Sequence, residues 1–226
     1  HPHVLKNVIG RSVEKRPIEL LRITDPGSGE PRGKLGFWIT CRQHAGETSA
    51  SWTLEGFMEF LLSDNPAAKA LREKAITNVV PMVNPDGVVA GNYRNNNAGV
   101  NLNRVWDSPD PQTSPEILGI TKAISTWREN GNRYDFFADF HSDSEALGHY
   151  SFYADETLKP KKYPKPEAYH EDSLRFIRMV ARHAPDFDPE EGASSSEQTG
   201  LGRCHQMETH GVLALIFEAG YSKVLF

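Results

Sequence analysis

The stretch ITCRQHAGETSAS, residues 39 to 51, joins an apolar, β-branched run to the beginning of a helix-like pattern. His44 and Glu47 lie between the two, three residues apart, and both side chains can bind a metal ion. A strand followed at once by a helix is typical of α/β proteins, which bind ligands beyond the carboxyl ends of their strands. The same spacing occurs by chance in surface loops. The rest of the chain must therefore show whether His44 and Glu47 belong to a metal site or only share a loop.

The composition is ordinary for a globular protein and argues against several classes of function. The 226 residues fit a single domain with one core. No apolar run approaches the roughly 20 residues that a membrane span requires. The formal net charge of −5 argues against nucleic acid as the main partner, because phosphate binding needs a basic surface. The only two cysteines, Cys41 and Cys204, cannot form a disulfide framework, which favours a reducing, cytoplasmic compartment.

Strand-like and helix-like segments alternate along the chain. Strands are predicted at residues 16–24, 33–40, 76–83, 134–140 and 211–220, and helices at 49–64, 114–130 and 172–184. The first helix should bury one apolar stripe, made of Trp52, Leu54, Phe57, Met58, Leu61 and Leu62. The alternation predicts an α/β fold, with a mixed, mostly parallel central sheet and helices on both faces.

Three side chains with metal or acid–base chemistry follow or end predicted strands: His44, His141 and Glu218. Because the carboxyl ends of parallel strands meet at one edge of a sheet, we expect the three to lie together. His44, Glu47 and His141 make a zinc ligand set that leaves a position open for water, and Glu218 is then free to act on that water. The chain has no H-E-x-x-H helix, which excludes a thermolysin-like arrangement.

Five motifs occur in a fixed order: QHAGET, NPDGVVAGNYR, NLNRVW, DFHSDS and LIFEAGY. In these motifs the chain resembles the zinc metallocarboxypeptidases, and it is most similar to their cytosolic branch, several of whose members shorten C-terminal glutamate tails. The similarity runs from about Val8 to Tyr221. It implies one zinc ion bound by His44, Glu47 and His141. It also implies that Glu218 is the general base.

The same resemblance implies roles for several polar residues. Arg94 would stabilise the oxyanion, while Asn103 and Arg104 would hold the terminal carboxylate of the substrate, which a guanidinium binds well. Arg203 lies about fifteen positions before Glu218, where relatives place a residue at the floor of the pocket for the last side chain. An arginine there would pair with C-terminal Glu or Asp. The alternative is that Arg203 is a surface arginine on a helix.

The chain departs from the cytosolic branch at Asn101, because NLNR replaces the usual DLNR. The missing acid would orient one zinc-binding histidine, and an asparagine oxygen can accept the same bond without the charge. We therefore expect weaker zinc binding or altered activity. Residues 1–226 are expected to form the catalytic domain. Its first elements, its final helix and the β-rich domain of cytosolic relatives are expected to lie outside this chain or to be missing.

Three functions remain open. The first is a carboxypeptidase acting on peptide or protein C-terminal tails, the second a zinc-dependent deacylase of small N-acyl amino acids. The third is a catalytically silent binder of acidic C-termini, which the retention of Glu47 and Glu218 disfavours. The Lys/Pro run from Lys159 to Lys165 is interpreted as a solvated loop, with electrostatic steering of acidic tails as the alternative. Neither a membrane nor nucleic acid is expected as a partner, and the sequence predicts no oligomeric state.

Overall fold

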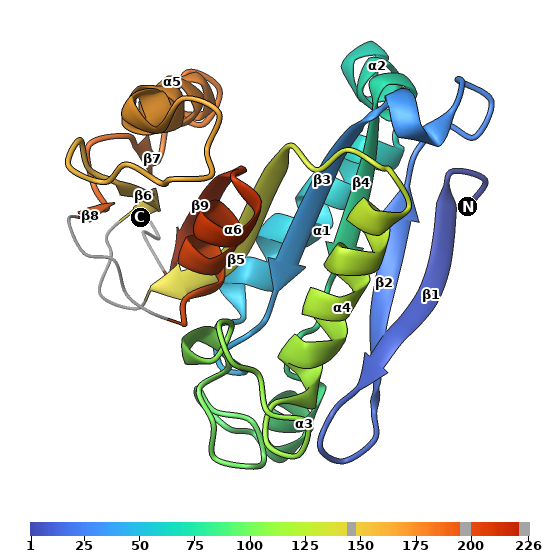
Figure 1. Ribbon diagram of the computed structural model, residues 1–226, viewed down its shortest axis with the longest axis vertical. Coiled ribbons are helices and arrows are strands. Elements are labelled where there is room, and N and C mark those ends of the chain that lie inside the picture. Colours follow the sequence, from blue (N-terminus) through green and yellow to red (C-terminus); the bar gives the residue numbers. More distant parts are fainter. Residues whose placement is uncertain (144–147, 195–199, 222–226) are drawn as a thin grey trace, which may run out of the picture.

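One mixed β-sheet forms the centre of the molecule in the computed structural model, which describes residues 1–143, 148–194 and 200–221 (Figure 1). The strand order is β1-β2-β4-β3-β5-β9-β6-β7, with β8 paired to β6. Strands β4, β3, β5 and β9 are parallel. The pairs β1–β2, β2–β4 and β6–β9 are antiparallel, whereas β7 and β8 are parallel to β6. The strands are β1 (Val4–Arg11), β2 (Pro17–Ile23), β3 (Leu35–Cys41), β4 (Ala75–Val80), β5 (Phe136–Asp143), β6 (His149–Ala154), β7 (Phe187–Asp188), β8 (Ala193–Ser194) and β9 (Leu213–Gly220).

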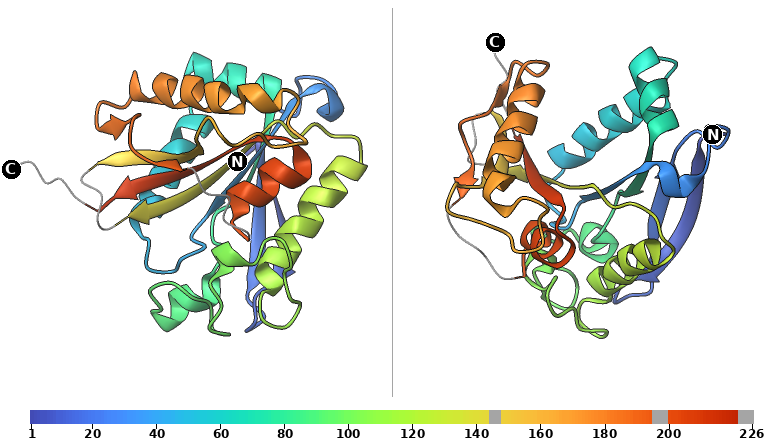
Figure 2. Two further views of the ribbon diagram at one scale, coloured as in Figure 1. Left: turned by 60° about the vertical axis from the view of Figure 1, so that its left-hand side comes forward. Right: turned by 45° about the horizontal axis from the view of Figure 1, so that its top comes forward.

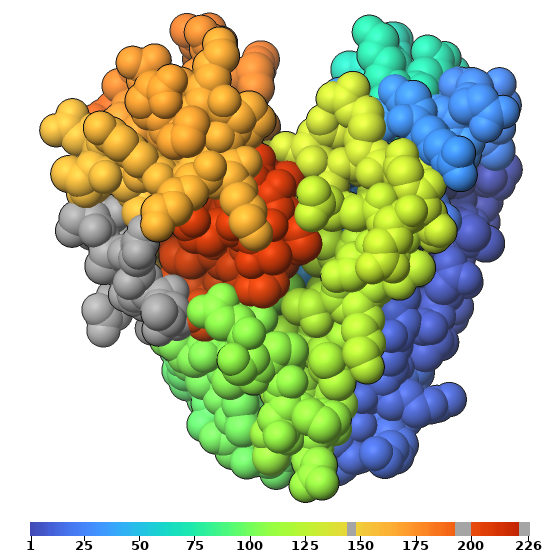
Figure 3. Space-filling view, viewed as in Figure 1, coloured from blue at the N-terminus to red at the C-terminus, as the bar shows by residue number. Residues whose placement is uncertain are grey.

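Helices cover both faces of this sheet, as the alternation of elements predicts (Figure 2). Helices α1, α2 and α5 lie on one face, and α4 and α6 lie on the other. In the space-filling view, the surface of α6 and β9 lies between the β6–α5 region and α4 (Figure 3). The helices are α1 (Ser49–Leu62), α2 (Pro66–Lys74), α3 (Pro85–Ala90), α4 (Pro115–Glu129), α5 (Tyr169–Ala181) and α6 (Gly202–His210). The predicted fold class is confirmed.

The predicted apolar stripe of α1 is wrong at Trp52. This side chain is 73% exposed, while the buried residues of the helix are Ala50, Leu54 and Leu61. Each residue advances a helix by about 100°, so a residue two positions from Leu54 points to the opposite side. The strands and helices that were not predicted are β1, β6, β7, β8, α2, α3 and α6. Strand β1 is an edge strand with mostly exposed residues, which removes the alternation that marks a strand.

Residue Gln43, just before His44, is held by the core that lies between the sheet and the helices α4 and α6. Trp106 is fully buried and packs edge to face on Phe137 of β5, with ring centroids 5.8 Å apart. Its indole nitrogen donates a hydrogen bond to Gln43 Oε1 at 2.9 Å. The end of β3 is thereby tied to the segment that carries Asn103 and Arg104. No helix among the described residues is long and apolar enough to cross a membrane.

Candidate metal and catalytic centre

The side chains expected at the carboxyl edge of the sheet do lie there together. His44 and Glu47 lie in the loop between β3 and α1, and His141 lies near the end of β5. Glu218 of β9 is paired in register with His141. Parallel strands bring these residues, far apart in sequence, to one edge.

Glu47 lies between the two histidines and contacts both. Its Oε1 is 2.6 Å from His44 Nδ1, and its Oε2 is 2.7 Å from His141 Nδ1. The two Nδ1 atoms are only 3.2 Å apart, and all three side chains are buried. Potential ligand atoms of the three residues lie within 4.8 Å of one another. Two imidazoles and one carboxylate that converge in this way fit a zinc ion and could hold one.

Each histidine is held by its other ring nitrogen. Asp139 Oδ2 accepts a hydrogen bond from His141 Nε2 at 2.7 Å, and Asn101 Oδ1 accepts one from His44 Nε2 at 3.0 Å. Such bonds fix the tautomer and the orientation of the ring. Both Nδ1 atoms are therefore turned toward Glu47.

Asp139 is a residue of the site that sequence reasoning missed. It is completely buried on β5 and also accepts hydrogen bonds from Thr40 Oγ1, at 2.7 Å, and from the Gln43 side-chain amide. The signal was present, because residues two apart on a strand share a face and Asp139 lies two positions before His141.

The environment shifts the pKa values of the two glutamates in opposite directions. Burial would raise the pKa of Glu47, but hydrogen bonds from His141 and His44 outweigh it and hold this pKa well below its usual range. Burial raises the pKa of Glu218 to about 8, an effect that His141 opposes and the charge of Glu47 reinforces. Shifts of this kind, inside a cleft, are typical of functional sites.

All eight predicted site residues line one cavity of about 310 Å³. The lining consists of His44, Glu47, Tyr93, Arg94, Asn103, Arg104, His141, Ser142, Asp143, Phe152, Leu201, Arg203, Ile216 and Glu218. This volume is at the lower end of the range of small-molecule sites, and suits one amino-acid residue better than a folded segment.

Two arginines bring positive charge to the exposed part of the cavity, whereas Asn103 is buried. Arg94 Nη1 lies 3.8 Å from Glu47 Oε1, and its side chain is 40% exposed. Arg104 is exposed and donates one hydrogen bond to the Asn103 carbonyl oxygen at 2.7 Å. Burial lowers the pKa of Arg104, and the charge of Arg94 lowers it further. An anion bound between the two guanidinium groups would relieve this repulsion.

Arg203 lies at the buried end of the same cavity, so its interpretation as a surface arginine is wrong. Arg203 is only 1% exposed, and its Nε and Nη1 are buried without a hydrogen-bond partner among residues 1–143, 148–194 and 200–221. The start of α6 is fixed beside it, since Gly202 N donates to Asn103 Oδ1 at 2.9 Å. A β-carbon on Gly200 would lie 2.0 Å from the Arg104 carbonyl oxygen, so this close approach requires glycine. Sequence reasoning could not predict the burial, which depends on tertiary contacts.

Two tyrosines that the sequence did not single out hold the metal-ligand loop. Gly46 N donates to the Tyr93 carbonyl oxygen at 2.6 Å, and the Tyr221 hydroxyl donates to the Gly46 carbonyl oxygen at 2.6 Å. The backbone between His44 and Glu47 is therefore bonded on both sides.

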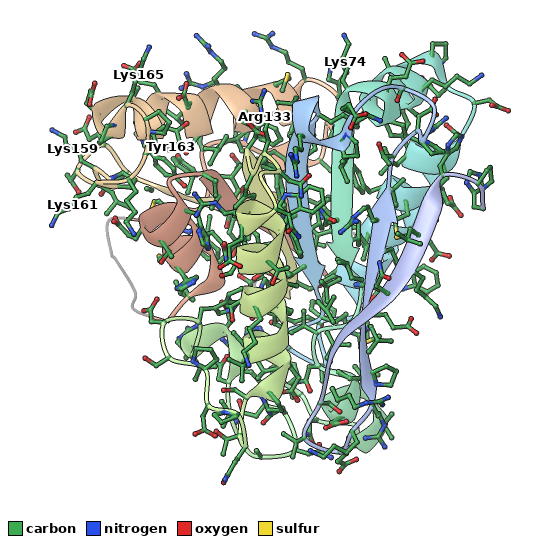
Figure 4. The ribbon with its side chains drawn as sticks, turned by 45° about the vertical axis from the view of Figure 1, so that its right-hand side comes forward. Lys74, Arg133, Lys159, Lys161, Tyr163 and Lys165 are labelled. Carbon is green, nitrogen blue, oxygen red and sulfur yellow. The ribbon has the colours of Figure 1, made fainter. Side chains whose placement is uncertain are left out.

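The Lys/Pro run lies away from this cavity. Lys162 contacts the Thr209 carbonyl oxygen at 3.3 Å, near the end of α6 opposite to Arg203. Lys159, Lys161 and Lys165 project outward (Figure 4). This placement agrees with a solvated loop, and the steering of acidic tails stays a prediction.

Comparison with known proteins agrees with this geometry. A model of the zinc carboxypeptidase family matches residues 1–207. Cytosolic carboxypeptidase 6 of Mus musculus is 32% identical over 187 residues, which are 82% of this chain and 33% of that protein. Cytosolic carboxypeptidase 2 of Danio rerio is 42% identical over 142 residues, or 61% of this chain and 19% of that protein. The chain thus spans about a third or less of the length of these curated relatives.

Solved structures agree over nearly the entire chain. A metallo-carboxypeptidase from Burkholderia cenocepacia superposes with a TM-score of 0.85 and 31% identity, covering 100% of this chain and 58% of that one. A metallo-carboxypeptidase from Pseudomonas aeruginosa gives a TM-score of 0.80 and 29% identity, covering 98% of this chain and 56% of that one.

Proposed function

The chain belongs to the zinc carboxypeptidase family, and from that premise we propose that it hydrolyses the C-terminal peptide bond of peptides or protein tails ending in Glu or Asp. One observation carries the acidic preference: Arg203 lines the cavity of the candidate metal centre, and two of its nitrogens are buried with no partner in the described part of the chain. A buried guanidinium without a partner is costly, and a substrate carboxylate would remove that cost.

The proposed reaction uses the residues at the sheet edge. His44, Glu47 and His141 would hold one zinc ion, which would supply Lewis acidity toward the scissile carbonyl and toward a water molecule. Glu218 accepts the proton of that water and delivers it to the leaving amine. Its raised pKa, about 8, supports this role, because a base must also act as the acid in the second half of the reaction. Arg94 stabilises the negative charge that develops on the carbonyl oxygen.

Substrate recognition follows from the distribution of cations. Arg104 and Asn103 bind the terminal carboxylate near the cavity mouth, and Arg203 binds the last side chain at the buried end. The side chain of Arg104 is exposed and that of Arg203 is not, which supports this division. Only the last residue of a longer tail enters, which leaves the rest of the tail outside.

We also propose that the protein acts in the cytoplasm on acidic C-terminal tails. Two observations support this: the relatives named above are cytosolic carboxypeptidases, and both cysteines of the chain, Cys41 and Cys204, are free and buried.

The test is to incubate the zinc-loaded protein with three peptides that differ only in the last residue, Glu, Phe or Lys, and to measure the free amino acid. We expect release from the Glu peptide alone. Release from the Phe or Lys peptide would keep the reaction and overturn the acidic preference.

A parallel incubation with N-acetylglutamate separates the deacylase alternative. Hydrolysis of this small substrate without release from any peptide would overturn the carboxypeptidase proposal. The chelator-treated protein is the matched control and should release nothing.

A further inference from the structure

The carboxylate of Asp139, on β5, is completely buried and has no lysine or arginine partner in the part of the chain that the structure describes. The basic side chain within ion-pair distance of it is His141, whose Nε2 lies 2.7 Å from Asp139 Oδ2. A buried carboxylate is costly unless it is hydrogen-bonded and a positive charge lies nearby. Because Nδ1 of the same imidazole faces Glu47 and the proposed zinc ion, the metal would supply that charge through His141.

The surroundings of His141 Nε2 direct its proton to Asp139. Asn103 also lies near this nitrogen, with Nδ2 at 3.3 Å. Asn103 Oδ1 accepts a hydrogen bond from Gly202 N at 2.9 Å, which leaves the amide NH2 group, a donor only, toward His141. Asp139 is therefore the acceptor for Nε2–H, and Nδ1 keeps its lone pair for a metal.

Buried side chains hold the Asp139 carboxylate in this orientation. Thr40 of β3 is paired in register with Asp139, and its hydroxyl donates to Oδ1 at 2.7 Å. The Gln43 side-chain amide donates to Oδ2. Trp106 Nε1 donates to Gln43 Oε1 at 2.9 Å, which turns the NH2 group of Gln43 toward Asp139. All three donors are buried, so the carboxylate cannot turn away from His141 without leaving them unpaired.

The other histidine of the candidate metal centre is held by a neutral group. Asn101 Oδ1 lies 3.0 Å from His44 Nε2, and Asn101 is partly exposed. A charged acceptor makes a stronger hydrogen bond than an amide oxygen, and a site without water strengthens it further. The negative charge behind the two histidines is therefore on the His141 side.

We propose that Asp139 is a positioning residue that supplies the metal centre with the negative charge that Asn101 lacks. Asp139 contacts neither the metal nor the substrate. It acts through His141, by holding the ring with Nδ1 toward the metal and by making Nδ1 a stronger ligand. The inference rests on the proposed zinc ion, and it depends neither on the peptide specificity nor on Arg203.

The test measures zinc affinity by competition with a chelator, together with the histidine Nε2–H signals of the ¹⁵N-labelled, zinc-loaded protein. Asp139→Asn should lower zinc affinity by about 10–100-fold. The His141 Nε2–H signal should move upfield, because its charged acceptor is lost, while the His44 signal stays in place. Unchanged affinity and an unmoved His141 signal would overturn the proposal.

Asp86→Asn is the matched control for a loss of stability. Asp86 is also a completely buried carboxylate, and it is not among the residues that line the cavity of the candidate metal centre. Its substitution should leave zinc affinity and both histidine signals unchanged. An equal loss of affinity in Asp86→Asn and Asp139→Asn would show that destabilisation alone weakens zinc binding, and would overturn the proposal.

A charge swap separates the proposed role from simple packing. In the double variant Asn101→Asp with Asp139→Asn, the carboxylate lies behind His44 instead of His141, so zinc affinity should recover by about tenfold relative to Asp139→Asn alone. No recovery would contradict the role of the charge. If Asp139→Asn does not fold, Thr40→Val, which removes the bond to Oδ1, should still lower affinity several-fold and shift the His141 signal. An unsubstituted protein that binds no zinc would overturn the proposed zinc site itself, and this inference with it.

Discussion

At the scale of single residues, environment separates the two glutamates of the candidate site. Glu47 contacts the Nδ1 atoms of two histidines and accepts a hydrogen bond from Ser142 N, which favours the charged form. Glu218 has no such bonds in the described structure, and burial favours its neutral form. Two carboxyl groups whose pKa values are pushed apart are typical of an acid–base pair with divided roles. A ligand role suits the first glutamate, and proton transfer suits the second.

The first prediction concerns Glu218. Glu218→Gln removes the proton acceptor but none of the proposed ligands, so kcat for a Glu-terminated peptide should fall by roughly 10²–10⁴-fold. Bound zinc, measured by mass spectrometry of the metal, should stay at one ion per chain. Loss of zinc together with activity would show that Glu218 is itself a ligand and not the base.

The second prediction concerns Asn101, which contacts His44 Nε2 at 3.0 Å and also accepts from Asn103 N at 3.0 Å. Asn101→Asp keeps both bonds and adds a charge that strengthens His44 as a ligand. We expect zinc affinity to rise by about tenfold, and Asn101→Ala to lower it by about 10–100-fold. Competition with a chelator measures both. Equal affinities in all three proteins would contradict an orienting role.

At the scale of elements, α3 is bonded to the turn between β1 and β2. Asp86 is buried and accepts hydrogen bonds from Ser12 Oγ at 2.7 Å, Glu14 N at 2.8 Å and Arg16 Nη1 at 2.7 Å. Helix α3 begins the long segment that carries Arg94. The hydrogen bonds of Asp86 therefore connect the edge strands β1 and β2 to the segment that lines the catalytic cavity.

The third prediction is that Asp86→Asn lowers the free energy of unfolding by roughly 2–4 kcal/mol at pH 7. Burial would raise the pKa of Asp86, but the bonds from Glu14, Ser12 and Arg16 lower it. Its contribution is therefore present above the unfolded pKa of about 3.9 and is lost as pH falls through the folded value. In urea unfolding, the difference in the free energy of unfolding between the unsubstituted protein and Asp86→Asn should narrow below about pH 4. Asp64→Asn removes only an exposed ion pair with Lys69, so it should change the free energy of unfolding by less than about 1 kcal/mol. A difference between Asp86→Asn and the unsubstituted protein that stays constant across pH would contradict the account.

The regular spacing of apolar residues accounts for the strands, helices and site residues that could be predicted from the sequence. The buried strands and the helices α1, α4 and α5 carry strong apolar patterns. The order of these elements in the sequence is enough to predict that His44, His141 and Glu218 lie at one edge of the sheet. Helix α6 was missed because it buries polar residues, among them Arg203 and Gln206, that a pattern assigns to the surface. Such burial depends on contacts between distant segments, which no local pattern contains.

At the scale of the whole molecule, two cavities lie at different parts of one sheet. The cavity of the candidate metal centre is at the carboxyl edge of the parallel strands, and a second cavity, of about 470 Å³, lies under the end of α4, where the chain approaches β5. Both contain an arginine that is buried at least in part and lacks an ion-pair partner among the described residues.

The most direct measurement is the ratio of kcat/KM for two peptides that differ only in ending with Glu or Gln, made with zinc-loaded protein. The last side chains have the same shape and differ in charge, so the ratio isolates the pairing with Arg203. We predict a preference for Glu of about 100-fold or more, which falls toward one in Arg203→Gln, with thermal melting as the control for folding. Equal rates for the two peptides in the unsubstituted protein would contradict the account.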